Sequence, residues 1–101
     1  MTKPFVVVSE LTVPPEGIQA VRDAFEDRLG AVDSWPGFRG LEVWEATDDS
    51  AHLVMVSWWD NQETFRAYMR SPDHRRSHAR IPSGEHRPSL RNFQRYEVVA
   101  R

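Results

Sequence analysis

Apolar and polar residues alternate along the first part of the chain, which is typical of a β-strand. The span from Phe5 to Val13 is rich in β-branched residues, which favour strands. Its apolar positions divide between two faces: Phe5, Val7, Leu11 and Val13 on one, Val6 and Val8 on the other. Ser9 interrupts the first of these faces. A hydroxyl at this place needs a hydrogen-bond partner or a pocket, so Ser9 is a candidate functional residue.

After this strand the spacing of the apolar residues changes to that of a helix. Pro14 and Pro15 stop the strand and open the helix, because proline is tolerated in a first helical turn but not in a sheet ladder. The helix is predicted to present one apolar stripe, made of Ile18, Val21, Phe25, Leu29 and Val32. We expect its charged residues, Arg22 and Glu26 among them, to lie largely on the solvent side. Residues 33–37 contain a proline and a glycine and are predicted to end it.

The middle of the chain is predicted to form a hairpin of two antiparallel strands. Residues 38–46 alternate imperfectly between apolar and polar positions, whereas residues 53–59 are apolar on both faces. The polar residues 47–50 between them form the predicted turn. A strand that is apolar on both faces needs cover on both, so we expect a partner on the face that the helices leave bare.

Capping residues mark the start of a second helix at residues 60–63. The inner stripe of this helix is Phe65, Tyr68 and Met69. Ser71 and Pro72 are predicted to end it and to begin a short helix that runs to about Arg80, with the serine as cap and the proline in the first helical position. Residues 90–99 form the last predicted strand.

The resulting order, β-α-β-β-α-β with one extra helical turn, predicts an α+β fold of the ferredoxin-like type, with an antiparallel sheet. Two helices then cover one face of four strands. Burial of the other face against a second copy of the chain predicts a symmetric homodimer. The alternative is a monomer with an exposed apolar sheet.

The chain has 101 residues, of which 40% are apolar, and a second hydrophobic core does not fit in that length. We therefore expect a single domain over residues 1–101. The absence of cysteine excludes disulfides and thiol nucleophiles. No apolar stretch approaches the roughly 20 residues that span a bilayer, and no signal-peptide core precedes the first strand, so we expect a cytoplasmic protein without membrane contact.

Charge is unevenly distributed along the chain. The formal net charge of −2 argues against a dedicated nucleic-acid binder, and the predicted strands are acidic and lack the glycine-aromatic signature of RNA-binding sheets. Residues 1–65 carry four basic and twelve acidic side chains, whereas residues 66–101 carry nine arginines and three acidic side chains. Either the two parts neutralise each other, or the last third binds an anionic group.

His74 and His78 are spaced to project from one face of the predicted short helix. Such a pair is able to bind a metal ion, but the sequence offers no third ligand at a characteristic spacing. It also lacks the acidic residue that stands between the histidines of the H-E-x-x-H motif. The alternative is a pair of surface histidines on a basic helix.

Three segments of the chain resemble a known family. They are Trp59-x5-Phe65-x2-Tyr68-x2-Ser71-Pro72-x5-His78-Ala79-Arg80, Ser34-x-Pro36-Gly37-Phe38, and Ser9-Glu10-Leu11-Thr12-Val13. Together they resemble the antibiotic biosynthesis monooxygenase (ABM) superfamily, and within it the small haem-degrading monooxygenases. The likeness extends from about Phe5 to Val99. It implies a dimeric α+β barrel of two ferredoxin-like protomers, each with its own pocket between helices and sheet.

The resemblance also implies roles for particular residues. His78 matches the histidine that binds the haem iron, and Ser9 and Tyr68 stand where the haem-degrading members have an asparagine and a tryptophan. The remaining implied cofactor-binding residues are Phe25, Arg28 and Phe65. Haem would be both substrate and cofactor: it would bind through His78, and its ring would be opened with dioxygen and electrons from a reductase or a small reductant.

The departures at Ser9 and Tyr68 leave three outcomes open: slower haem degradation, haem binding without turnover, or another activity. The main competitor in the same superfamily is a cofactor-free monooxygenase that oxidises an aromatic polyketide phenol or quinol to a quinone. In that chemistry Ser9, Trp59, Tyr68 and His78 would position or deprotonate the phenol. A third hypothesis is a non-catalytic dimer that binds haem or another small aromatic molecule.

Overall fold

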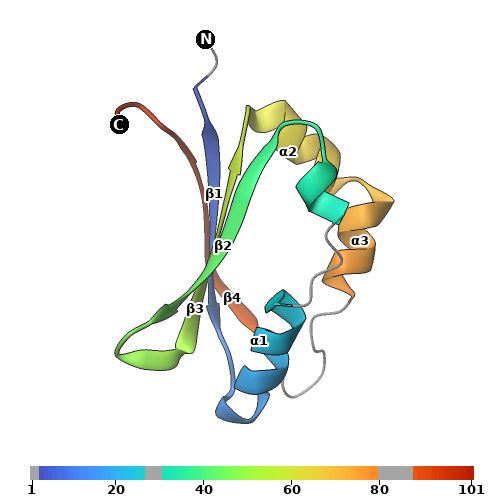
Figure 1. Ribbon diagram of the computed structural model, residues 1–101. Coiled ribbons are helices and arrows are strands. Elements are labelled where there is room, and N and C mark those ends of the chain that lie inside the picture. Colours follow the sequence, from blue (N-terminus) through green and yellow to red (C-terminus); the bar gives the residue numbers. More distant parts are fainter. Residues whose placement is uncertain (1–2, 27–30, 80–87) are drawn as a thin grey trace.

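The structure is a computed structural model that describes residues 3–26, 31–79 and 88–101. Its elements in chain order are β1 (Phe5–Thr12), a 3-10 turn (Pro15–Gly17), α1 (Ile18–Glu26), a second 3-10 turn (Ala31–Ser34), β2 (Phe38–Ala46), β3 (Asp49–Trp59), α2 (Gln62–Met69), α3 (Pro72–His78) and β4 (Ser89–Glu97). This order confirms the predicted ferredoxin-like arrangement with an additional short helix (Figure 1).

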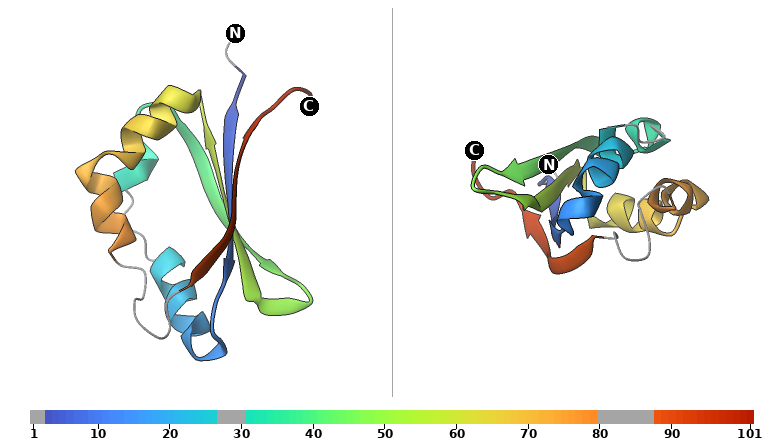
Figure 2. Two further views of the ribbon diagram at one scale, coloured as in Figure 1. Left: turned by 180° about the vertical axis from the view of Figure 1, so that it is seen from behind. Right: turned by 90° about the horizontal axis from the view of Figure 1, so that it is seen from below.

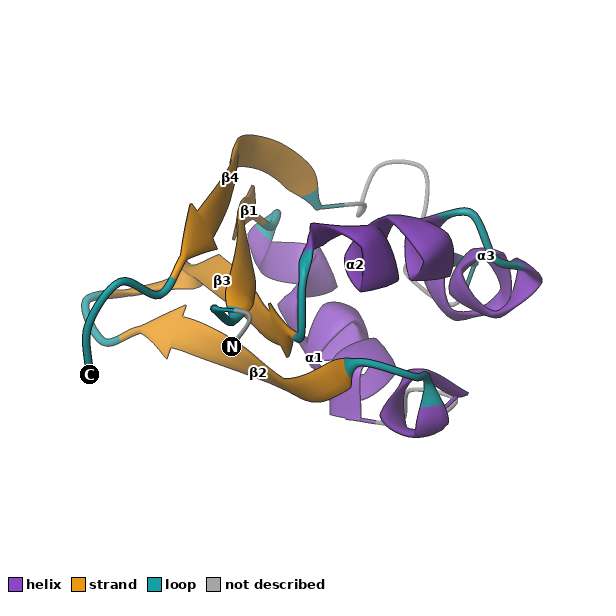
Figure 3. Ribbon diagram, turned by 90° about the horizontal axis from the view of Figure 1, so that it is seen from above, coloured by secondary structure: helices purple, strands orange, loops and turns teal. Residues whose placement is uncertain are grey.

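The four strands form one antiparallel sheet in the order β2-β3-β1-β4. All the helices lie over one face of this sheet and leave the other face bare, as the front and back views show (Figures 1 and 2). The view from above separates the sheet from the helical layer (Figure 3). The fold therefore has two layers, and a site between them is bounded by the sheet on one side and by helices on the other.

Some predicted boundaries were wrong. The third strand begins at Asp49 rather than Leu53, because Ala46 pairs with Asp49 and leaves only two residues for the hairpin turn. The first and last strands end at Thr12 and Glu97, slightly before their predicted ends.

The first helix is shorter than its predicted stripe. α1 ends at Glu26, and the stripe residue Val32 lies in the second 3-10 turn instead. Leu29, a further member of the stripe, lies outside the described residues, as does Arg80 at the predicted end of the short helix.

Two apolar clusters fill the space between the layers. The aromatic cluster consists of Phe5, Val7, Val32, Trp59, Phe65 and Tyr68. The aliphatic cluster consists of Val13, Val21 and Leu53, with Leu11, Ile18, Phe25 and Val43 packed against it. Phe5 and Val7, at the start of β1, belong to the first cluster, and Val13, directly after the end of β1, belongs to the second, so the clusters lie at opposite ends of the helix-covered face.

Local hydrogen bonds explain where α2 and α3 begin. Asn61 caps α2, since its side-chain oxygen accepts a hydrogen bond of 2.9 Å from the backbone N–H of Thr64. Ser71 caps α3 in the same way, accepting from the N–H of His74 at 3.1 Å. Gly37, just before β2, has a φ of 86°, and a Cβ at this position would lie 2.5 Å from Cγ2 of Thr64. Only glycine fits here without displacing the start of α2.

The bare face of the sheet combines apolar side chains with the polar side chains of Glu10, Glu42, His52 and Gln94. Strand pairing places the following residues on it: Val6, Val8, Trp44, Val54, Val56, Trp58 and Tyr96. Trp44 is 49% exposed and Tyr96 is 53% exposed. The expectation that the third strand is apolar on both faces is therefore confirmed. No helix in the described ranges is long and apolar enough to cross a membrane.

Candidate functional site between the sheet and the helices

Ser9 lies on the helix-facing side of β1 and is only 6% exposed. Its sheet neighbours are Met55 on β3 and Phe93 on β4. Val7, two residues before it, belongs to the aromatic cluster, and Leu11, two residues after it, packs on the aliphatic cluster. Ser9 therefore occupies the boundary between the two clusters, in the middle of the covered face.

The hydroxyl of Ser9 has no hydrogen-bond partner among the described residues. No side-chain oxygen or nitrogen in this part of the chain is both fully enclosed and unpaired, so the Ser9 oxygen keeps some access to open space. A largely buried hydroxyl without a partner is costly unless water or a ligand binds it. Ser9 is thus placed to contact a molecule that enters between the layers.

Tyr68 and Phe65 project from α2 into the aromatic cluster, and they are 6% and 7% exposed. The Tyr68 ring centroid lies 5.5 Å from that of Trp59, 5.4 Å from that of Trp35 and 5.4 Å from that of His74. These contacts are within the range of favourable aromatic pairs. Core packing is therefore sufficient to explain the position of the Tyr68 ring.

Trp59 is 2% exposed, and its indole N–H donates to the hydroxyl of Ser57 at 2.9 Å. Its one polar group is therefore engaged inside the core. The hypothesis of a phenol-binding pocket requires Trp59 to contact the phenol. In the structure the Trp59 ring instead packs against Phe38, Phe65 and Tyr68.

His78 is the last residue of α3, and its side chain lies outside the described part of the structure. Arg28 also lies outside it. His74, one turn before His78, makes an edge-to-face contact with Tyr68 and so packs α3 against α2. Within the described ranges, no group of three or more histidine or carboxylate side chains is placed to hold a metal ion.

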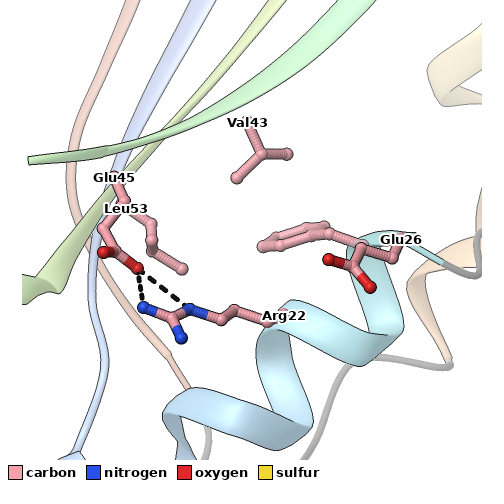
Figure 4. Close-up of a pocket in the computed structure, with 6 residues that line it drawn as sticks. Arg22, Glu26, Val43, Glu45 and Leu53 are labelled. Atoms are coloured by element: carbon pink, nitrogen blue, oxygen red, sulfur yellow. Dashed lines mark hydrogen bonds and ion pairs between the residues drawn. The ribbon is translucent and has the colours of Figure 1, made fainter.

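A pocket of about 190 Å³ lies between α1 and the strands β2 and β3. Its lining residues are Arg22, Phe25, Glu26, Val43, Glu45 and Leu53 (Figure 4). Pockets that enclose a whole drug-sized ligand measure about 300–1,000 Å³. This one therefore accommodates an edge of such a ligand rather than all of it. Phe25, predicted as a cofactor-binding residue, is among its walls.

An ion pair spans this pocket. Arg22 extends from α1 to the sheet, where its Nε lies 2.9 Å from Oε1 of Glu45 and its Nη2 contacts the same oxygen (Figure 4). The sequence pattern predicts Arg22 largely on the solvent side and does not single out Glu45. The contact with Glu45 was not predictable from local pattern, because the two residues are 23 positions apart in the chain. The one relevant signal in the sequence is the position of Arg22 beside the apolar stripe.

The structure thus divides the predicted site residues between three places. Tyr68 and Phe65 lie in the aromatic cluster, Phe25 lies in the α1 pocket, and Ser9 lies between the two clusters. The chain is thus a ferredoxin-like α+β protein whose candidate site residues lie between the sheet and the helices.

Comparison with known proteins agrees with this class. The model of the antibiotic biosynthesis monooxygenase family matches residues 4–80, and the chain belongs to this family. It is 28% identical over 90 residues to a staphylobilin-producing heme oxygenase of Staphylococcus epidermidis, an alignment that covers 87% of this chain and 86% of the relative. It is 26% identical over 69 residues to a mycobilin-producing heme oxygenase of Mycobacterium tuberculosis, covering 68% and 66% of the two chains.

Solved structures share the fold. A Nitrosomonas europaea protein assigned to the antibiotic biosynthesis monooxygenases has a TM-score of 0.81 and 12% identity, over 98% of this chain and 93% of that chain. The heme-degrader MhuD from Mycobacterium tuberculosis, solved with two hemes bound in its active site, has a TM-score of 0.76 and 23% identity, over 96% and 97% of the two chains.

Proposed function

We propose that this chain is a haem-degrading monooxygenase that binds haem between its sheet and its helices. The proposal is supported by family membership and by relatives named as heme oxygenases. The observation in this chain that carries it is the buried residue Ser9, whose hydroxyl has no partner among the described residues. It faces the layer in which an aromatic ligand would lie.

The residues present fit an aromatic ligand of this kind. The α1 pocket has apolar walls formed by Phe25, Val43 and Leu53, and in this proposal it would accept one edge of the porphyrin. Ser9, in the middle of the covered face, would offer its hydroxyl to a polar atom of the ligand. The neighbouring sheet residues Met55 and Phe93 provide apolar contact on either side of that hydroxyl.

His78 is proposed to bind the haem iron, since it ends α3 on the helical layer that faces the sheet. Arg28 is proposed to meet the carboxylates of the ligand. Bound haem supplies an iron that activates dioxygen, and the electrons come from a reductase or a small reductant. The protein's own part is to orient the ring, to exclude water with its two clusters and to present the Ser9 hydroxyl.

Titration of the purified protein with hemin tests the proposal. We expect a shifted Soret band that saturates near one equivalent per chain, and loss of this band in His78→Ala. His52→Ala is the matched control, because His52 lies on β3 on the bare face of the sheet. Its Nε2 lies 3.7 Å from Oε1 of Glu10. An unchanged free-hemin spectrum overturns the proposal.

A second measurement separates degradation from binding. Ascorbate and oxygen are added to the hemin complex, and loss of the Soret band is followed together with formation of an open-chain tetrapyrrole. A stable Soret band under these conditions would indicate that the protein binds haem but does not degrade it. The paired variant Ser9→Asn, Tyr68→Trp, which introduces the asparagine and tryptophan of the haem-degrading members, is then expected to gain turnover.

We also propose that the bare sheet face is the interface of a homodimer. Soluble monomers rarely expose large apolar patches, and a two-fold axis would let the apolar side chains of this face cover one another. Trp44 and Tyr96 are about half exposed on this face, so both are available to a partner. Sedimentation is expected to give a dimer at micromolar concentration and a monomer for the Trp44→Asp, Tyr96→Asp variant. A wild-type monomer overturns this interface.

A further inference from the structure

The charges around the α1 pocket are not balanced. The pocket contains one guanidinium, that of Arg22, and two carboxylates, those of Glu26 and Glu45. Both contacts of Arg22 go to a single oxygen of Glu45, and no other hydrogen bond of Arg22 occurs among the described residues. Glu26, one turn further along α1, is exposed and has no ion pair in this part of the chain. An anionic ligand therefore meets a pocket whose single cation is already engaged.

The ion pair between Arg22 and Glu45 is weak enough for a ligand to break it. The side chains of Arg22 and Glu45 are 39% and 38% exposed, and pairs exposed to this degree are weakly held in water. Two of the five N–H groups of the guanidinium point to Glu45, so a planar carboxylate of a ligand would compete for the same donors. Figure 4 shows the pair crossing the pocket from α1 to the sheet.

We propose that Glu45 sets the charge selectivity of this site by occupying the Nε–Nη2 edge of Arg22, so that a ligand carboxylate binds this edge only by displacing Glu45. The inference rests on the proposed function, which places an edge of the porphyrin in this pocket. Glu45 then lowers the affinity for carboxylated ligands and leaves the affinity for uncharged aromatic edges unchanged. Arg22 becomes a ligand-binding residue whose Nε–Nη2 edge is occupied by Glu45 in the free protein.

Four variants distinguish this role of Glu45 from a general effect of charge. Glu45→Gln frees Arg22 and removes one negative charge from the pocket. Glu26→Gln removes the same charge from the same pocket but breaks no contact of Arg22. The last two variants are Arg22→Gln and the double variant Arg22→Gln, Glu45→Gln, which complete a double-mutant cycle.

The probes are hemin, which carries two carboxylates, and its dimethyl ester, which carries none. Glu45→Gln is expected to bind hemin about three- to tenfold more tightly than the wild type, because hydrogen bonds to charged groups are strong but this site is partly exposed. The dimethyl ester should bind all variants equally. In the Arg22→Gln background the gain from Glu45→Gln should be absent, and Glu26→Gln should change the affinity for hemin less than twofold.

The outcomes distinguish the two proposals. If neither porphyrin shifts its spectrum with any variant, the proposed function and this inference both fail. If hemin binds the wild type and Glu45→Gln equally, or if Glu26→Gln and Glu45→Gln give the same gain, the role of Glu45 is refuted and the haem site stands. Circular dichroism of each variant checks the fold, and exposed Glu45 is not expected to disturb it.

Discussion

Replacing Ser57 with alanine tests the internal support of the aromatic cluster. Trp59 is 2% exposed and Ser57 is 8% exposed, and the indole N–H donates to the serine hydroxyl at 2.9 Å. Alanine removes the acceptor, and a donor buried to this extent is not reached by bulk water. Leaving a buried donor unpaired costs roughly 1–3 kcal/mol. We therefore expect the free energy of unfolding to fall by about 2 kcal/mol.

Urea unfolding followed by circular dichroism measures this loss. With an m-value of about 2 kcal/mol/M, typical of small domains, the midpoint should fall by about 1 M while m stays constant. Ser50→Ala is the matched control, since Ser50 also lies on β3 but is exposed. Its free energy of unfolding should change by less than about 0.5 kcal/mol.

A double-mutant cycle identifies the cause of the loss. Phenylalanine at position 59 has no N–H, so Ser57→Ala should be nearly neutral in the Trp59→Phe background. The cavity left by the smaller ring is common to both arms of the cycle and cancels. An equal cost of Ser57→Ala in both backgrounds would refute the hydrogen-bond argument, as would a cost below about 0.5 kcal/mol in the wild type.

Two further predictions concern the segments that position α2. Gly37→Ala should lower the free energy of unfolding by roughly 1–3 kcal/mol, because alanine is strained at a φ of 86° and its methyl group would meet Thr64; an unchanged thermal melt would contradict this. Asn61→Ala should cost about 1 kcal/mol through loss of the helix cap, whereas Asn61→Asp should retain most of the stability; equal losses in urea unfolding would argue against capping.

Most of the fold was predictable from local pattern. The alternation in β1 and β2 and the caps at Asn61 and Ser71 act over a few residues, and each is visible in the sequence. The start of β3 was not, because it depends on the pairing of Ala46 with Asp49 across the hairpin. The length of α1 was overestimated for a similar reason, since an apolar stripe does not distinguish a helix from a helix followed by a 3-10 turn.

In the candidate site, the alternation of β1 predicts Ser9 as a polar interruption of a buried face, and the structure confirms its burial. Phe25 came from the family resemblance, and only the tertiary structure placed it in a pocket. The structure also decided that Ser9 lies between two clusters and that Arg22 reaches Glu45. These are contacts between residues far apart in the chain, and hydrophobic periodicity carries no information about which distant side chains meet. The sequence therefore determined which faces are buried, whereas the packing of α1 on the sheet determined which charges line the pocket.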